Sequence, residues 1–126
     1  MRRLLVTNVW IDAMSGEPEA ARALTIAIAN EWCGFSAMTR LEVLSYSGLT
    51  ASDITDWRTL LSGAVEVPMS ETVIEEAARL RRTVRMKTPD AIIAATALLE
   101  NAALVTRNLG DFRRVPGLMV IEPVAV

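Results

Sequence analysis

Three acidic residues stand where they could act together: Glu42, Asp90 and Asp111. Each follows or opens an apolar segment that predicts a buried strand or helix. Asn8 and Asn108 each lie two residues after the end of a predicted strand. Carboxylate and amide oxygens are ligands that hard cations such as Mg²⁺ and Mn²⁺ prefer. The pattern indicates metal-assisted chemistry at the carboxyl ends of parallel strands, where the sites of open α/β sheets form.

The chain has no histidine and a single cysteine, Cys33. Their scarcity excludes Ser–His–Asp triads, Cys–His nucleophile pairs, and thiolate or histidine metal sites. Catalysis would have to depend on carboxylates, amides, hydroxyls, lysine or arginine. The net charge is −2, so any binding to nucleic acid needs a local basic cluster.

Each candidate also has an ordinary structural interpretation. Glu42 could face solvent from a helix, and Asp90 could interact with the positive end of a helix dipole. Asp111 could be a turn acid. Asn8 and Asn108 could be helix caps. The functional hypothesis therefore depends on the joint placement of these residues and not on any single one.

Short, continuously apolar segments alternate with segments of helical periodicity. We predict strands at Leu4–Val6, Trp32–Ser36, Val65–Val67, Ala103–Thr106 and Leu118–Ile121. We predict a first helix after a turn or cap at Thr7 and Asn8. Three more are predicted over Glu17–Asn30, from Met38 up to Gly48, and over Asp53–Leu61. The last two would begin after caps at Ser70 and Thr88 and extend to Val84 and Leu99. This alternation is typical of a parallel sheet covered by helices on both faces. The expected fold class is α/β, with three α/β/α layers and a central parallel sheet of about five strands.

The chain of 126 residues contains no linker, repeat or low-complexity segment, so we expect one domain over residues 1–126. No apolar run is long enough to cross a membrane. The apolar run that follows Met1, Arg2 and Arg3 is too short for a signal peptide, so a cytoplasmic protein is expected. Hydrophobic residues make up 52% of the chain, and this surplus suggests a buried interface as well as a core.

Five segments resemble toxins of the VapC type, which are PIN-domain nucleases of bacterial VapBC toxin–antitoxin pairs. They are Leu5–Asp12, Ser36–Leu44, Thr88–Ala97, Leu104–Phe112 and Val115–Pro123. The resemblance extends over residues 4–123 in the order and spacing of the family. The segments around Asp90 and Asp111 are the most specific, whereas residues 17–32 and 50–62 contribute little.

The resemblance implies a PIN fold and a Mg²⁺- or Mn²⁺-dependent endoribonuclease. Asp90 would be a primary metal ligand, and Glu42 would be a ligand or orient the attacking water. Asp111 and Asn108 would complete the acidic pocket. The family also implies an RNA substrate, a VapB-like antitoxin that inserts a segment into the acidic groove, and a homodimer.

One position departs from the family pattern. Val6 stands where VapC-type toxins normally have a metal-ligating aspartate, and valine offers no oxygen to a cation. Thr7 and Asn8 would support the site through hydrogen bonds. Asp12 lies six residues further on and is expected to be a surface acid, so it is a poor substitute.

Val6 leaves two hypotheses open. The chain is a ribonuclease toxin impaired by a single-base change from Asp to Val, or it is a catalytically inactive PIN-fold module that binds antitoxin or RNA. The codon in the native gene distinguishes the two. A third alternative, another Mg²⁺-dependent phosphotransferase, needs an aspartate nucleophile at the end of the first strand, and Val6 cannot supply it.

Basic residues flank the candidate acids: Arg81, Arg82, Arg85 and Lys87 precede Asp90, and Arg107, Arg113 and Arg114 lie near Asp111. Taken singly, each fits a solvated helix face or loop. As a set they predict a rim that holds RNA phosphates, or the acidic residues of an antitoxin. Trp10, Trp32 and Trp57 could stack on bases, but packing in the core or against a partner is the expectation.

Overall fold

Five short parallel strands form the centre of the protein, whose computed structural model describes residues 1–126. They are β1 (Arg2–Leu5), β2 (Trp32–Ser36), β3 (Val65–Val67), β4 (Ala103–Val105) and β5 (Val120–Ile121). The spatial order is β3-β2-β1-β4-β5, and all four neighbouring pairs are parallel. The predicted parallel sheet of about five strands is confirmed.

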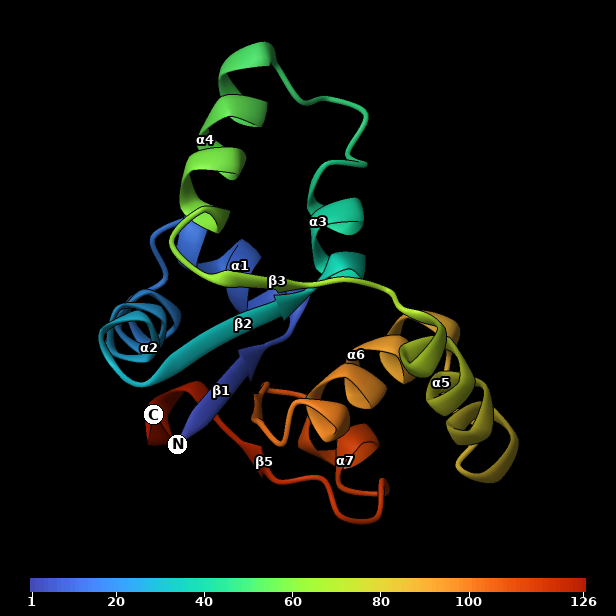
Figure 1. Cartoon of the computed structure of the whole chain (residues 1–126). Coiled ribbons are helices and arrows are strands. Elements are labelled where there is room, and N and C mark those ends of the chain that lie inside the picture. The colour runs from blue at the N-terminus through green and yellow to red at the C-terminus, as the bar shows by residue number, and fades with distance from the viewer.

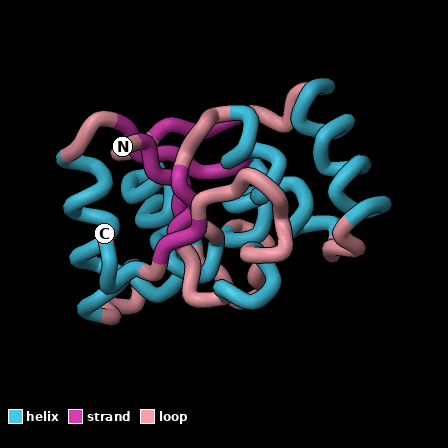
Figure 2. The backbone as a smooth tube through the Cα atoms, turned by 90° about the horizontal axis from the view of Figure 1, so that it is seen from below, coloured by secondary structure: helices cyan, strands magenta, loops and turns pink.

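Helices cover both faces of this sheet. They are α1 (Thr7–Met14), α2 (Pro18–Ala29), α3 (Ala37–Val43), α4 (Ala51–Leu61), α5 (Glu71–Thr83), α6 (Thr88–Leu99) and α7 (Leu109–Phe112), followed by the short 3₁₀ helix η1 (Pro123–Ala125). Figure 1 shows α1 and α2 on one side of the strands and α5 and α6 on the other. Figure 2 shows helices on either side of the strands. The three-layer α/β/α architecture is confirmed. No helix has the length and apolar composition needed to span a bilayer.

Burial explains why the apolar segments take these positions. Every residue of Ala91–Ala97 in α6 is buried, because α6 lies between the sheet and α5. Trp10 of α1 is 0% exposed and meets Phe35 of β2 edge to face, with ring centroids 5.4 Å apart. Trp57 is buried as well, so the prediction of core packing is confirmed for both tryptophans. The Arg2 guanidinium lies 4.2 Å above the partly buried Trp32 ring.

Two of the predicted helix starts differ from the structure. The Ser70 hydroxyl accepts a hydrogen bond from the Val73 N–H, so the predicted cap of α5 is confirmed. Thr88, in contrast, is the first residue inside α6, and Lys87 precedes it without a side-chain cap. Thr7 and Asn8 likewise lie inside α1 and do not cap it. Pro89 accounts for the first case, because its fixed φ angle suits either of the first positions of a helix.

One boundary in a loop region was also predicted wrongly, and one short helix was not predicted. The helix that was expected to reach Gly48 ends at Val43. Asp111, for which a turn was the ordinary structural alternative, lies in α7, a helix of four residues. So short a helix has no apolar periodicity that a sequence could reveal.

The strand order places a reversal of the chain at the centre of the sheet. From β1 the chain moves outward to β2 and β3, and it then returns to pair β4 with the other side of β1. The connections that leave β1 and β4 therefore diverge. In open α/β sheets, a crevice forms at this point beyond the carboxyl ends of the strands.

Candidate functional site

A small hollow lies at this reversal, beyond the ends of β1 and β4. It has a volume of about 90 Å³, and Ile93 and Phe112 contribute its apolar wall. Six of the residues singled out from the sequence line it: Val6, Thr7, Asn8, Glu42, Asp90 and Asn108. We call it the acidic hollow.

Four different segments of the chain carry these side chains. Val6 follows β1, and its N–H donates to the Val105 carbonyl of the neighbouring strand at 3.1 Å. Glu42 lies on α3, directly after β2, and Asp90 lies in the first turn of α6. Asn108 precedes α7 as its N-cap. Residues more than 80 positions apart in the chain meet here because parallel strands bring their carboxyl ends to one edge.

Asp111 lies beside the acidic hollow and not in its lining. Its carboxylate accepts a hydrogen bond from the Asn108 side-chain amide at 2.9 Å. Together with Asp90, it lines an adjoining hollow of about 120 Å³. Asp90 is common to both hollows and connects them.

The three acids influence one another. Burial raises the pKa of the Asp90 carboxyl above its ordinary value, and the nearby charges of Asp111 and Glu42 raise it further, whereas Lys87 lowers it. Like charges in a partly desolvated site disfavour ionisation. Negative charge thus gathers around Asp90 with incomplete compensation by protein cations. No group of three or more carboxylates, however, lies close enough together to hold a metal ion.

Removing the charge of Asp90 is expected to stabilise the metal-free fold at neutral pH. The folded state holds the Asp90 proton more tightly than the unfolded state, because the pKa of Asp90 is raised on folding. Its contribution to stability is therefore fully present below the ordinary value of 3.8 and is lost as the pH rises through the folded pKa. Asp90→Asn should unfold at a higher urea concentration than the unaltered chain at pH 7 in EDTA, with a smaller difference near pH 4. A difference that is absent, or that grows on acidification, would contradict the repulsion inferred at this site.

A chain of hydroxyl groups holds Glu42 in place. The Thr7 hydroxyl donates to Glu42 Oε1 at 2.7 Å, and the Thr7 and Thr39 hydroxyl oxygens are 2.9 Å apart. Because the Thr7 hydrogen points to the carboxylate, Thr39 donates to Thr7. Thr39, which is 0% exposed, was added to the site only from the structure. Its position three residues before Glu42, on the same helical face, was the available signal.

The effect of breaking this chain can be measured on the fold. Thr39→Val removes the donor to Thr7 inside the protein and should cost about 1–2 kcal/mol in the free energy of unfolding. Thr39→Ser keeps the hydroxyl and should lose less. Thr25→Val is a matched control, since the exposed Thr25 hydroxyl bonds only to the Ala21 carbonyl of its own helix. Equal urea unfolding curves for the Thr39→Val and Thr25→Val variants would show that the buried hydroxyl chain contributes nothing.

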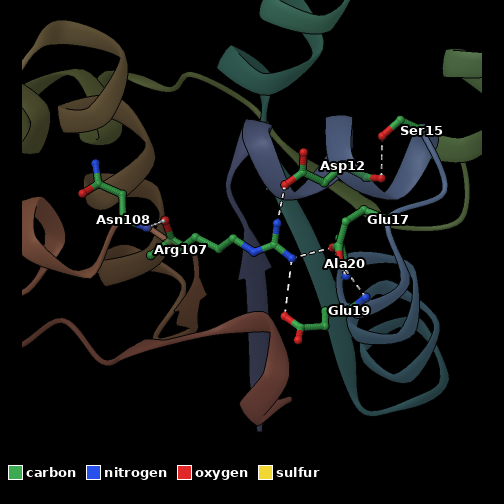
Figure 3. Close-up of polar contacts among 8 residues, drawn as sticks. Asp12, Ser15, Glu17, Glu19, Ala20, Arg107 and Asn108 are labelled. Carbon is green, nitrogen blue, oxygen red and sulfur yellow. Dashed lines mark hydrogen bonds and ion pairs between the residues drawn. The ribbon is translucent and has the colours of Figure 1, made fainter.

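Arg107, one of the predicted phosphate ligands, points away from the acidic hollow. Its guanidinium pairs with Asp12 at 2.9 Å, Glu17 at 2.5 Å and Glu19 at 3.6 Å. Figure 3 shows the side chain reaching toward α1 and the start of α2, on the opposite side from Asn108. Asp12 lies at the surface in this cluster, as expected.

The other basic residues fall into two groups, those that hydrogen-bond to backbone carbonyls and those that form no side-chain contact of this kind. The Arg81 Nε donates to the Met86 carbonyl at 3.4 Å, and the Arg114 Nη1 donates to the Val84 carbonyl at 2.9 Å. Neither of these arginines has a carboxylate partner. The remaining candidates are exposed and form neither an ion pair nor a side-chain hydrogen bond: Arg82, Arg85, Lys87 and Arg113.

Comparisons with known proteins agree with this geometry. Residues 3–118 match the family described as PIN domain. The chain is 31% identical over 122 residues to ribonuclease VapC19 of Mycobacterium tuberculosis, covering 92% of this chain and 96% of that protein.

Solved structures of toxin–antitoxin proteins also resemble the chain. A chain of a toxin–antitoxin complex from Klebsiella pneumoniae is 34% identical, with a TM-score of 0.80 over 96% of this chain and 97% of that one. A chain of Rickettsia felis VapBC2, crystallised with a DNA fragment from its promoter, has a TM-score of 0.83 at 23% identity over 97% and 98%, which supports the fold alone. With the parallel five-stranded sheet and the acids at its centre, these matches show that the chain belongs to the PIN-domain family, as a homologue of the VapC ribonuclease toxins of toxin–antitoxin systems.

Proposed function

We propose that the chain is a Mg²⁺- or Mn²⁺-dependent endoribonuclease toxin whose activity is impaired by Val6. The convergence of Glu42, Asp90 and Asn108 in one hollow, with Asp111 beside it, supports this function. The meeting of Glu42, Asp90 and Asn108 in one hollow is the observation that carries the proposal. The raised pKa of Asp90 agrees with it, because burial and the nearby charges of Asp111 and Glu42 both disfavour the ionised carboxyl, and a divalent cation would offset that cost.

The donor set fits a hard cation in type. Asp90 and Glu42 would bind the ion directly, and Asp111 and Asn108 would complete the site. The ion would supply charge stabilisation at the scissile phosphate and a more acidic water. Thr7 would orient Glu42 through its hydrogen bond at 2.7 Å, and the exposed Asn8 would bond to water or substrate.

Val6 would occupy the position of the family's first aspartate. It follows β1 directly, lines the acidic hollow and is only 6% exposed. A carboxylate at this place would meet Asp90 and Glu42 across the hollow. Valine presents methyl groups there instead, so the cation would lose one of its charged ligands.

The second candidate function is binding without chemistry. It is favoured because no three Asp, Glu or Cys side chains are placed together to hold a metal ion. In that case the PIN fold would bind antitoxin or RNA and leave the RNA intact. RNA cleavage by a variant with a restored acid separates the two functions.

The partners proposed for the chain are RNA, a VapB-like antitoxin and a second copy of itself, in the cytoplasm. Exposed basic residues would hold RNA phosphates. They are Arg85 and Lys87, which line the adjoining hollow, together with Arg81, Arg82 and Arg113, and Arg107 only if its ion pairs open. The toxin–antitoxin complex from Klebsiella pneumoniae supports an antitoxin partner. Exposed apolar side chains such as Leu41 and Tyr46 support a homodimer.

The testing experiment compares RNA cleavage by the unaltered chain with cleavage by Val6→Asp, in buffers with Mg²⁺ and with Mn²⁺. Cleavage that requires both the metal and Asp90 supports the nuclease. A folded Val6→Asp variant that cleaves no RNA in the pool moves the proposal to the binding module.

A further inference from the structure

The loop between α5 and α6, residues 84–87, forms one wall of the second hollow. This hollow of about 120 Å³ is lined by Arg85, Met86, Lys87, Asp90, Asp111 and Arg114. We call it the loop hollow. Asp90 belongs to both hollows, so a ligand in the acidic hollow could extend into the loop hollow without leaving the protein surface.

Hydrogen bonds from two arginines hold this loop from both sides. Arg114 donates to the Val84 carbonyl at the start of the loop, and Arg81 donates to the Met86 carbonyl near its end. Both guanidinium groups therefore support the backbone. The loop has a defined shape before any ligand arrives.

The two cations that this loop presents are not tied up by direct contacts within the protein. Arg85 and Lys87 are exposed, and neither forms an ion pair or a side-chain hydrogen bond. Arg107 is different, because three carboxylates surround its guanidinium. Free cations at the edge of a hollow remain available to an anion.

The backbone of Arg85 adds a second observation. Its φ angle is +61°, directly after the capping residue Val84 of α5. Glycine is the usual residue at this left-handed position, because a Cβ atom strains it. An arginine is present here despite that strain, and its side chain lines the hollow.

We propose that the loop hollow is a phosphate subsite for RNA, in which Arg85 and Lys87 hold the phosphate next to the one in the acidic hollow. This proposal deepens the proposed ribonuclease function and rests on it. A polynucleotide carries a phosphate at every step, so a single strand can place successive phosphates in the two adjoining hollows. An acidic peptide has no such regular spacing of its charges.

The subsite is tested by RNA binding without cleavage. A fluorescein-labelled single-stranded RNA is titrated with the chain in EDTA over a series of salt concentrations, with fluorescence anisotropy as the signal. The double variant Arg85→Gly, Lys87→Gln should bind about tenfold more weakly, and its salt slope should fall by about 0.7 for the lost phosphate contact. Arg58→Gln is the matched control, because Arg58 is exposed on α4, forms no ion pair and lies outside both hollows.

The single variant Arg85→Gly tests whether weaker RNA binding is caused by misfolding. Glycine adopts a φ of +61° without strain, so the Tm of this variant should equal or exceed that of the unaltered chain while RNA binding weakens. Weaker binding with an unchanged or higher Tm supports the subsite. Binding equal to that of the Arg58→Gln control, or no RNA binding by the unaltered chain even at low salt, overturns it.

Two further measurements separate the related hypotheses. If the variants lose affinity for a polyglutamate peptide and keep it for RNA, the hollow serves an acidic protein and the RNA proposal is overturned. If Val6→Asp cleaves RNA and adding Arg85→Gly leaves KM unchanged, the subsite fails while the nuclease stands. A lack of cleavage by Val6→Asp counts against the nuclease alone, because the binding experiment requires no chemistry.

Discussion

Val6→Asp is expected to raise RNA cleavage in Mn²⁺ or Mg²⁺ by at least about 100-fold, because changes outside the direct ligands of a metal already alter affinity or activity about 10- to 100-fold. Val6 lines the acidic hollow with Glu42 and Asp90, so the new carboxylate would join two acids already in place. Its charge would increase repulsion in the metal-free protein. A divalent cation should therefore raise the Tm of Val6→Asp more than that of the unaltered chain.

Two control variants test separately whether the negative charge at position 6 and the carboxylate of Asp90 are required for cleavage. Val6→Asn is close in shape to the aspartate variant but neutral, and it should cleave much more slowly. Val6→Asp combined with Asp90→Ala should be inactive, since Asp90 is the proposed primary ligand. Cleavage by the unaltered chain at the rate of Val6→Asp would show that Val6 does not impair the site. Cleavage that persists without Asp90 would point to a contaminating nuclease or to a different site.

Trp10→Ala is expected to lower the free energy of unfolding by about 3–5 kcal/mol, the loss typical of emptying a large aromatic position in a core. Trp10 is 0% exposed and meets Phe35 edge to face, so it fastens α1 to the sheet. α1 also carries Thr7 and Asn8 into the acidic hollow. The loss should therefore loosen the site as well as the fold. Urea unfolding followed by circular dichroism measures the change.

Trp10→Phe is the matched control. It keeps an aromatic ring against Phe35 and removes the Trp10 Nε1 group, which is buried without a hydrogen-bond partner. Its loss of stability should be clearly smaller than that of Trp10→Ala, because less volume is emptied and no polar group is left unpaired. A Trp10→Ala variant within about 1 kcal/mol of the unaltered chain would mean that α1 is held mainly by other contacts.

Much of the fold could be predicted from the chain alone, for identifiable reasons. The strand Val65–Val67 was predicted with the bounds that the structure has, and the buried α6 was predicted to within one residue at its start and with its observed end. Both have strong local signals: an apolar run closed by a proline, and an apolar helix that opens with Pro89. The start of α1 and the presence of α7 were not predicted correctly. Their signals are capping details and a length of four residues, which are below what periodicity resolves.

The sequence by itself determined the α/β class, the parallel sheet and the identity of the candidate acids, because apolar periodicity and strand-end polarity are local properties of the chain. Only the tertiary structure decided which residues act together. It placed Asp111 beside the acidic hollow and added Thr39 to the support of Glu42. It also turned Arg107 toward Asp12, Glu17 and Glu19 and left Arg85 and Lys87 unpaired. The physical reason is that hydrogen bonds and ion pairs depend on distances of a few ångströms between segments far apart in the chain, and packing alone sets those distances.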